Sequence, residues 1–408
     1  MRSVTTSSKL LNFPASKLHL KEKDNTMKRR DFLKLGVLGT GGALLGWDGM
    51  ADAAQQAAKG PFRFPAPVYR TLGRTGLKIT VVSFGAMLTP EPEVIRVAFE
   101  HGVNYVDTAR SYGGGRNEEV VAKALKGIRN RVTVATKINW RSRTKEDIFQ
   151  SVETSLRALE TDTIDVIQLH SLSGRERIFE PETREALLTL RKQGKVRFFG
   201  VTTHTNEAEV VNALVDDPER FFDMALVKYN FRSGDEIRKA IARAAQAGIG
   251  IVAMKTQAGG YASEALGPIS PHQAALKWAL SDRNVTAAIP GMRDLAELRE
   301  DIAVMGMRLT LADSFILRCY GAATASRYCH LCGRCEGSCP RGVAISIVNR
   351  SLMYAEAYRS EELARATYDG IPAQASAAAC LDCERCVARC VNGLDIAAKM
   401  ARARELLA

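Results

Sequence analysis

Short apolar runs alternate with longer amphipathic runs over most of the 408-residue chain. The longer runs have helical spacing, as where Ile148, Val152, Leu156 and Leu159 fall on one face. The short runs are rich in β-branched residues and predict eight strands: Ile79–Phe84, Val103–Asp107, Val132–Lys137, Asp165–His170, Val196–Val201, Met224–Tyr229, Gly250–Lys255 and Thr286–Ile289. Eight strands alternating with helices over about 240 residues predict an α/β fold, the (β/α)8 TIM barrel, at 68–305.

A doubly wound parallel sheet is the alternative architecture for this alternation. It would require a glycine-rich turn after the first strand, and the segment SFGAMLTP that follows it has none. The barrel is therefore the preferred prediction.

Ionisable residues stand at the ends of three consecutive predicted strands. These are Asp107, Lys137 and His170, and Tyr112 follows the first of them by five residues. In TIM barrels the chemistry sits at the carboxyl ends of the strands, so we expect these four side chains to meet there. A neighbouring ammonium favours phenolate, so we expect Lys137 to lower the pKa of Tyr112. A buried lysine needs a carboxylate partner, which Asp107 would supply.

The chain from Val68 to about Val304 resembles the aldo/keto reductases. The motifs that carry the resemblance are YRTLGRTGLKI, SFGAM, DTARSYGGGRNEE, VATKI, IDVIQLH, GKVRFFGVT, KYN and IPGM. The resemblance implies reduction of a carbonyl, or oxidation of an alcohol, with NAD(P)H. It also implies that Tyr112 donates the proton, that Lys137 and Asp107 form an ion pair that tunes it, and that His170 orients the substrate oxygen.

The resemblance also assigns positions to cofactor binding: Thr202, Thr203, Met254, Gly291, Arg293 and Asp301. Several depart from the family pattern. Thr202 and Thr203 replace a Ser-Asn pair, Met254 replaces an aromatic residue that stacks on nicotinamide, and Leu226 stands where a glutamine is expected. Arg293 remains as a phosphate-binding candidate in a loop without the usual Lys-Ser pair. The choice between NAD and NADP stays open.

Cysteine distribution sets the last eighty residues apart. All nine cysteines lie at or after Cys319, which argues against a disulfide scaffold. Eight of them form two runs with gaps of two, two and three residues: Cys329, Cys332, Cys335 and Cys339, then Cys380, Cys383, Cys386 and Cys390. Zinc sites use two separated pairs of ligands, so zinc fits this spacing poorly.

The doubled run resembles the bacterial two-cluster ferredoxins. In that arrangement the fourth cysteine of each run binds the other cluster. The resemblance implies one 4Fe-4S cluster on Cys329, Cys332, Cys335 and Cys390, and a second on Cys380, Cys383, Cys386 and Cys339. We therefore expect a helical connector at 306–328 and an α-rich ferredoxin-type domain at 329–408. A helical pattern at 345–358, between the two runs, is expected to pack against the barrel.

The N-terminus predicts a targeting segment. The formal net charge is +12, and half of it lies in the first thirty residues, which argues against nucleic-acid binding by the rest of the chain. Arg29 and Arg30 before a small-residue-rich apolar run resemble a Tat export signal, which we place at 27–53. Residues 1–26 would be a disordered leader or a mis-assigned start, and 54–67 a linker. The short, glycine-rich run predicts no stable membrane span. The expected location is periplasmic, with the cytoplasm as the alternative.

Together these features predict an oxidoreductase acting on a small carbonyl or alcohol, with a possible redox partner protein. Nicotinamide transfers two electrons as hydride and each cluster transfers one, yet no flavin motif is present to couple them. Two alternatives therefore stay open. The barrel could be a scaffold for an electron-transfer protein, or the clusters could be purely structural. Substrate identity and reaction direction are not defined by the sequence.

Overall fold

The structure, a computed structural model, describes residues 63–139, 141–261 and 270–407. These residues belong to one compact unit. The predicted leader, the twin-arginine segment and most of the predicted linker lie outside the described residues, so their assignments stay predictions.

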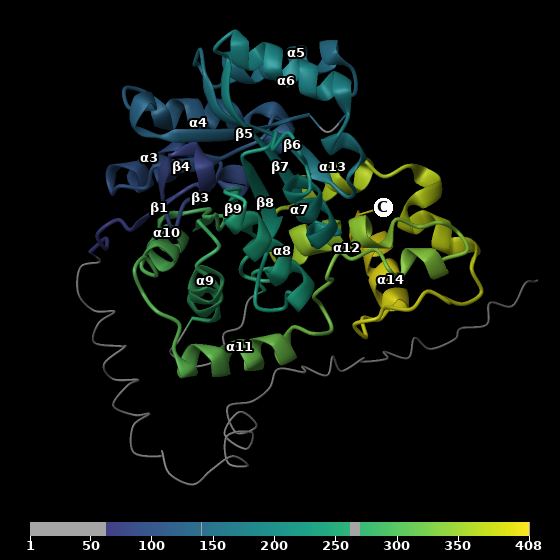
Figure 1. Cartoon of the computed structure of the whole chain (residues 1–408). Coiled ribbons are helices and arrows are strands. Elements are labelled where there is room, and N and C mark those ends of the chain that lie inside the picture. The colour runs from purple at the N-terminus through teal and green to yellow at the C-terminus, as the bar shows by residue number, and fades with distance from the viewer. Residues whose placement is uncertain (1–62, 140, 262–269, 408) are drawn as a thin grey trace, which may run out of the picture. The chain divides into compact units, whose positions relative to one another are not determined.

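Eight parallel strands form the barrel (Figure 1). They are β3 (Phe84–Gly85), β4 (Tyr105–Asp107), β5 (Thr133–Ile138), β6 (Ile164–Leu172), β7 (Val196–Thr203), β8 (Met224–Lys228), β9 (Gly250–Met254) and β10 (Ala287–Ala288). The sheet closes on itself between the first and last strands. The backbone N–H of Ser83 donates to the Ala288 carbonyl over 2.9 Å, and that of Gly85 donates to the Pro290 carbonyl over 3.1 Å. The TIM-barrel prediction is confirmed.

One helix follows each strand of the barrel. They are α3 (Pro92–Glu100), α4 (Asn117–Leu125), α5 (Lys145–Ala158), α6 (Pro181–Lys192), α7 (Glu207–Val215), α8 (Asp235–Gln246), α9 (Pro271–Ser281) and α10 (Leu295–Ile302). Helix α5 shows why they form. A capping box between Thr144 and Asp147 starts the helix, and Ile148, Val152 and Leu156 are buried on its inner face.

The floor of the barrel corrects one sequence prediction. The expected first strand, Ile79–Phe84, is two elements, because β2 (Lys78–Thr80) pairs antiparallel with β1 (Tyr69–Thr71) as a hairpin. Leu72 and Ile79 of this hairpin are buried in the barrel interior. The hairpin turn fits tightly: a Cβ on Gly73, which has φ +48°, would lie 2.3 Å from the backbone nitrogen of Gly250. The amino ends of the strands are thereby covered, and the carboxyl ends remain for a site.

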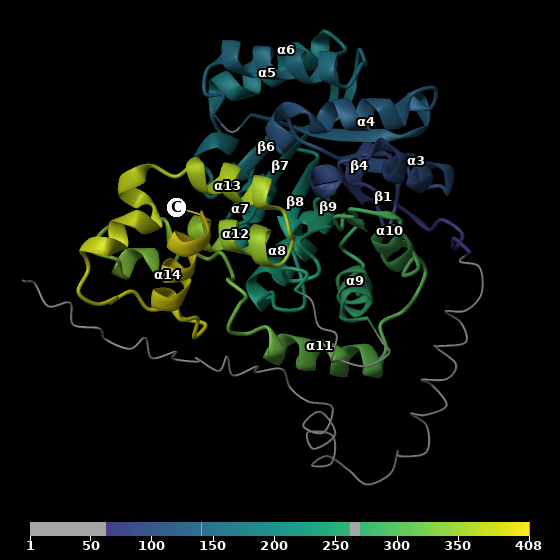
Figure 2. The same cartoon turned by 180° about the vertical axis from the view of Figure 1, so that it is seen from behind.

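The described C-terminal part consists of α-helices joined by loops and short 3-10 turns, and both cysteine runs lie in these connections. Helix α11 (Leu311–Ala323) packs on α9 through Ile316 and Leu317. Helices α12 (Ile345–Glu356), α13 (Glu361–Asp369) and α14 (Ile396–Leu407) share a second apolar core that includes Val348, Leu352 and Met400. Figure 2 shows α12 and α13 beside β7 and α7. The predicted α-rich C-terminal part is present, and the helix predicted at 345–358 corresponds to α12, which ends two residues earlier at Glu356.

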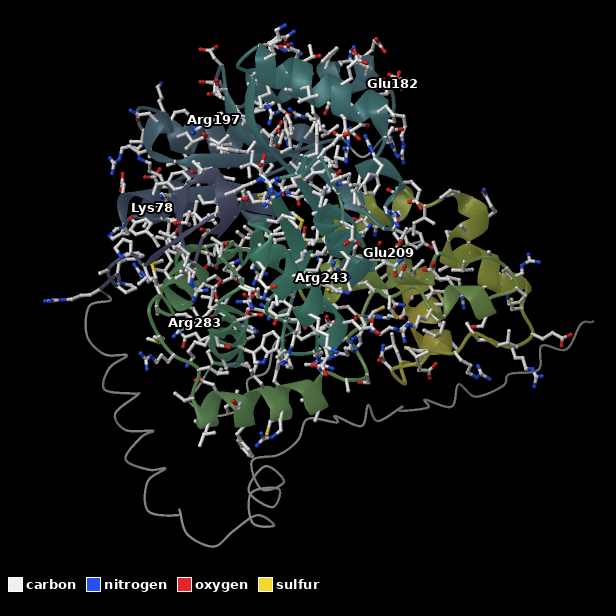
Figure 3. The ribbon with its side chains drawn as sticks, viewed as in Figure 1. Lys78, Glu182, Arg197, Glu209, Arg243 and Arg283 are labelled. Atoms are coloured by element: carbon white, nitrogen blue, oxygen red, sulfur yellow. The ribbon has the colours of Figure 1, made fainter. Side chains whose placement is uncertain are left out.

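The outer surface of the barrel is charged. Lys78, Glu182 and Arg243 are exposed there (Figure 3). None of the helices in the described ranges is both long enough and apolar enough to traverse a bilayer.

Candidate active site and cysteine groups

The end of β4 and its neighbour β5 place a buried ion pair at the barrel mouth. The ammonium of Lys137 pairs with the Asp107 carboxylate and also donates to the Thr108 carbonyl over 2.7 Å. The second carboxylate oxygen of Asp107 accepts a hydrogen bond from Gln168 on β6 over 2.8 Å. Both charges are therefore buried with partners, as a stable internal ion pair requires.

Tyr112 and His170 complete the group. The Lys137 ammonium lies 4.6 Å from the centroid of the Tyr112 ring. The rings of Tyr112 and His170 meet edge to face, with centroids 6.0 Å apart and planes at 79°. Tyr112 opens the short 3-10 turn η3 (Tyr112–Gly115), in which Gly113 and Gly114 have φ values of 54° and 62°. Glycine adopts this left-handed backbone at low cost, so the triplet lets the chain reverse while Tyr112 faces the barrel mouth.

Electrostatics at this group differ from expectation in one respect. Burial raises the pKa of Tyr112 above its ordinary value, and the Lys137 ammonium offsets only part of that rise. The expectation of a net lowering is therefore wrong, because desolvation of the phenolate outweighs the ammonium. Burial alone would lower the pKa of Lys137, but the Asp107 carboxylate raises it overall, which keeps the ammonium charged. Burial and then the charge of Lys137 hold the pKa of His170 well below its usual range, so this imidazole is neutral.

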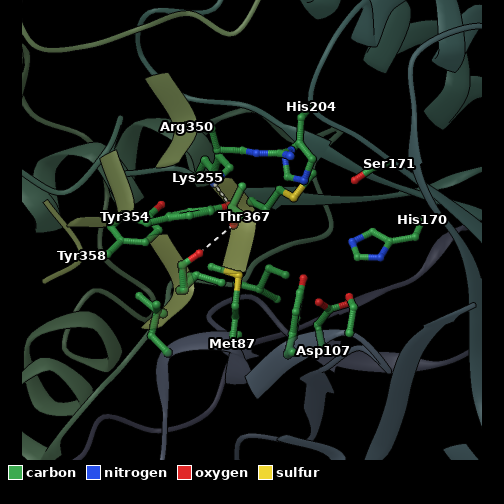
Figure 4. Close-up of a pocket in the computed structure, with 18 of the residues that line it drawn as sticks. Met87, Asp107, His170, Ser171, His204, Lys255, Arg350, Tyr354, Tyr358 and Thr367 are labelled. Carbon is green, nitrogen blue, oxygen red and sulfur yellow. Dashed lines mark hydrogen bonds between the residues drawn. The ribbon is translucent and has the colours of Figure 1, made fainter. Parts of the chain in front are cut away.

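The four side chains lie beside a cavity of about 920 Å³. Asp107, Tyr112 and His170 line it from the barrel, while α12 and α13 contribute another wall with Tyr354 and Thr367. Figure 4 shows Tyr354 across the pocket from Asp107 and His170. The volume is in the upper part of the range for small-molecule and cofactor sites. The site is thus shared by the barrel and the C-terminal domain.

The predicted nucleotide-binding positions separate into two sets. Four of them line the cavity: Met254, Gly291, Arg293 and Asp301. Thr202 and Thr203 are buried behind it, and their hydroxyls are engaged with backbone. The Thr202 hydroxyl accepts from the Ser171 N–H over 2.7 Å, and the Thr203 hydroxyl donates to the Thr205 carbonyl over 2.8 Å. The structure therefore gives these two threonines a role in shaping strand ends, and it does not bring them to the cavity.

Arg293, the residue predicted to bind a cofactor phosphate, is already engaged by other groups of the protein. Arg293 pairs with Glu297, with Nε 2.8 Å from Oε1, and its Nη1 donates to the Tyr358 carbonyl over 3.0 Å. Asp301, nearby in α10, is buried and accepts from Gln257 over 2.8 Å. Burial, then the charges of Glu300 and Glu297, raise the pKa of Asp301 well above its usual range. This end of the cavity is therefore acidic.

The two cysteine runs interleave in space. The pKa of Cys329 is raised to about 12, first by burial and then by the nearby thiols of Cys335, Cys332 and Cys390. The thiol of Cys380 is influenced in the same way by Cys339, Cys383 and Cys386 after burial. In each run, the first three cysteines thus lie near the fourth cysteine of the other run. This is the arrangement that the ferredoxin resemblance implied.

The chemistry of this donor set fits iron–sulfur clusters. The cysteines are free thiols, and backbone N–H groups approach two of the sulfurs, from Leu331 to Cys329 at 3.3 Å and from Asn392 to Cys390 at 3.4 Å. Within the described part of the chain, no three His, Cys, Asp or Glu side chains converge closely enough for a single metal ion. A four-iron cluster binds each thiolate on a different iron, so it accommodates more widely spread sulfurs than zinc does.

The first cysteine loop docks on the barrel. The Thr205 hydroxyl donates to the Leu331 carbonyl over 3.1 Å, and the Lys228 ammonium donates to the His330 carbonyl. Gly333 and Glu336, within the same run, line the cavity. The cysteine-bearing segment is therefore part of the wall of the candidate active site.

The cavity residues that the sequence predictions missed include three with ionisable side chains: His204, Lys255 and Arg350. His204 and Lys255 follow β7 and β9 directly, so the strand-end rule that found Lys137 could also have found them. Arg350 lies on α12, and its place depends on how that helix packs on the barrel. No local pattern in the sequence shows it.

The fold and this site together define a barrel oxidoreductase with an iron–sulfur domain. The aldo/keto reductase family matches residues 90–268, and a 4Fe-4S dicluster domain matches residues 328–394. The chain therefore contains an aldo/keto reductase domain and a C-terminal 4Fe-4S dicluster domain.

Individual relatives cover the barrel part. Similarity to L-galactose dehydrogenase of Arabidopsis thaliana is 26% identity over 281 residues, 58% of this chain and 87% of that protein. Similarity to the aldo-keto reductase YhdN of Bacillus subtilis (strain 168) is 38% over 125 residues, 28% of this chain and 37% of that protein. A solved aldo-keto reductase from Klebsiella pneumoniae in complex with NADPH shares the fold, with a TM-score of 0.53, 24% identity and coverage of 62% of this chain and 95% of that one.

Proposed function

We propose that the barrel reduces a small carbonyl compound, or oxidises the corresponding alcohol, through Asp107, Tyr112, Lys137 and His170. The observation that carries the proposal is the packing of Tyr112 between the Lys137 ammonium and the His170 ring at the cavity. Tyr112 gives its phenolic proton to the carbonyl oxygen, and the charged Lys137 stabilises the phenolate left behind. Neutral His170 donates a hydrogen bond to the same oxygen and orients it. The hydride adds to the carbonyl carbon, which completes a two-electron reduction.

A nicotinamide dinucleotide, when bound, supplies that hydride. Met254, Gly291 and Arg293 line the cavity where it would lie, and the NADPH complex of the Klebsiella relative supports this cofactor class. Glu297 already neutralises Arg293, so this arginine has little positive charge to offer an additional phosphate. We therefore propose NAD in preference to NADP. The ratio of turnover with NADH to turnover with NADPH tests this choice.

Two 4Fe-4S clusters are proposed for the C-terminal domain. Cys329, Cys332, Cys335 and Cys390 would hold the first, and Cys380, Cys383, Cys386 and Cys339 the second. The thiols that neighbour Cys329 and Cys380 support this assignment. The first cluster would adjoin the cavity, because its loop forms part of the cavity wall. We propose that it exchanges single electrons with a redox partner protein, since clusters transfer one electron each.

Replacing Tyr112 with Phe tests the catalytic proposal. The variant keeps the ring and removes the proton donor, so we expect kcat/KM for carbonyl reduction to fall by about 10²–10⁴-fold. Tyr69→Phe, at an exposed tyrosine of the floor hairpin, is the matched control and should keep full activity. The visible absorbance of the clusters should be unchanged in both. Equal activity of Tyr112→Phe and the unmodified protein would overturn the assignment.

An electron-transfer protein with a scaffold barrel is the second candidate. The internal pairing of Arg293 and the engagement of Thr202 and Thr203 favour it. Under this alternative the purified protein binds neither NADH nor NADPH, yet its clusters are reduced by a one-electron donor. Measurable NADH binding, displaced by NAD, would support the reductase instead.

A further inference from the structure

Arg350 is an unusual cation in the cavity wall. It projects from α12, within the C-terminal domain, and lines the cavity of the barrel site. Its guanidinium makes no ion pair and no hydrogen bond to any residue in the described ranges, and its Nε is buried without a partner. Arg350 is half-buried, and a buried guanidinium nitrogen without an acceptor is costly, because its hydration is lost and nothing replaces it. The side chain is therefore poised for an acceptor from outside the chain.

Lys255 and His204 lie close to it. Lys255 follows β9 in a left-handed backbone conformation with φ 54°, and its ammonium contacts the Tyr354 hydroxyl at 3.5 Å. No carboxylate of the described chain pairs with that ammonium. His204 follows β7, and its Nδ1 is buried without a partner. Figure 4 shows the Arg350 guanidinium directed toward the His204 ring, with Lys255 nearby.

His204 is neutral, and the nearby carboxylate of Glu336 is hydrogen-bonded elsewhere, so no carboxylate of the described chain binds these groups. Burial, then Lys255 and Arg350, hold the pKa of His204 well below its usual range, so it is neutral and carries one N–H donor. Glu336, in the same cavity wall, accepts instead from the backbone N–H and hydroxyl of Ser346, over 2.7 and 2.6 Å.

The remaining cation in this region is already satisfied. Lys228 pairs with Glu207 at 2.7 Å and donates to the His330 carbonyl. Among the described residues, Lys255 and Arg350 are therefore the two cations of this region without a carboxylate partner.

We propose that Arg350, Lys255 and His204 form a binding site for a carboxylate or phosphate group of a ligand that occupies the cavity. A guanidinium presents paired donors that match the oxygens of either group, and an ammonium and an imidazole N–H add single donors. The inference rests on the proposed function, since the anionic group belongs either to the carbonyl substrate or to the dinucleotide. In both cases a residue of the iron–sulfur domain selects what the barrel binds.

Binding of inorganic phosphate to the cluster-loaded full chain, measured by calorimetry, tests the site itself. Arg350→Met and Lys255→Met should each weaken phosphate binding by about 10-fold or more, because each removes a charge-assisted contact. Arg350→Lys should recover part of the affinity. Arg365→Met is the matched control, because Arg365 is exposed on α13, outside the cavity lining, and phosphate affinity should be unchanged. Absence of phosphate binding by the unmodified protein, or equal affinity in all variants, overturns the proposal.

Kinetics with two matched carbonyl probes then identify the source of the anion. Pyruvate and 2,3-butanedione differ in having a carboxylate or a methyl ketone beside the reacting carbonyl. If the substrate supplies the anion, Arg350→Met raises KM for pyruvate about 10-fold and leaves KM for butanedione unchanged. If the dinucleotide supplies the anion, Arg350→Met raises KM for NADH with either probe and leaves KM for pyruvate and for butanedione unchanged. Lack of turnover with either probe would count against the reductase proposal, while the phosphate measurement would still decide the anion site.

Discussion

At the scale of single residues, the charge of the buried Asp301 carboxylate destabilises the folded state, since burial raises its pKa well above the usual range. Its raised pKa means that the folded state holds the proton more tightly than the unfolded state does. Stability is therefore greatest at pH values below the unfolded pKa and falls as pH rises toward the folded pKa. Asn in place of Asp301 keeps an oxygen for the Gln257 amide, whose bond to Asp301 is 2.8 Å long, and carries no charge.

We accordingly expect Asp301→Asn to raise the melting temperature at neutral pH. The gain should shrink as the pH is lowered and vanish near pH 4, where aspartate is protonated in the unfolded chain as well. Thermal unfolding of the cluster-loaded protein over a pH series measures this. A melting-temperature difference that stays constant with pH would contradict the proposed origin.

Among the elements, the two cysteine loops make the most specific prediction. Because the thiol of Cys390 neighbours Cys329 and Cys335, Cys390→Ser and Cys332→Ser should damage the same cluster. Each variant should lose up to about four of about eight irons and the same signal in the electron paramagnetic resonance spectrum of the reduced protein. Cys339→Ser should remove the other signal. A Cys390→Ser spectrum that matches that of Cys386→Ser would show that each run binds its own cluster.

The elements also show how far the sequence predicts the fold and the site. Strand ends that carry ionisable residues located Asp107, Lys137 and His170, since apolar periodicity and strand polarity are both local. The hairpin of β1 and β2 was missed, because the apolar spacing of a hairpin strand is the same as that of a barrel strand. Arg350 was missed because its position depends on the docking of α12, which is a tertiary property.

The sequence also could not predict how ionisable side chains of the site are paired or how their pKa values shift. The net rise in the pKa of Tyr112 depends on how strongly the assembled cavity excludes water, and the spacing of Tyr112 and Lys137 carries no such information. The capture of Arg293 by Glu297 is similar. The two residues are four positions apart, in α10 and the loop before it, and this spacing permits an ion pair but leaves Arg293 equally able to bind a phosphate.

For the whole molecule, the predicted targeting segment at 27–53 allows a test that is independent of the site. We propose export by the Tat route, which carries folded proteins and so suits a chain whose clusters are inserted first. Replacement of both Arg29 and Arg30 by Lys should abolish export, and fractionation of expressing cells should then find the protein in the cytoplasm. The matched substitution of Lys21 and Lys23 by Arg should leave export intact. An unmodified protein that is found wholly in the cytoplasm would overturn the proposal.

The docking of the first cysteine loop on Thr205 and Lys228 has a consequence for the order of events in the life of the molecule. This loop, proposed above to hold iron, also forms part of the cavity wall, so we expect the barrel to acquire its finished site only after iron–sulfur assembly has fixed the loop. A chain that has received no iron would hold a full set of barrel catalytic residues and still lack one side of the chamber in which they act. Catalytic turnover would then occur only in chains that have received their clusters, and chains without iron would not oxidise the reduced nicotinamide.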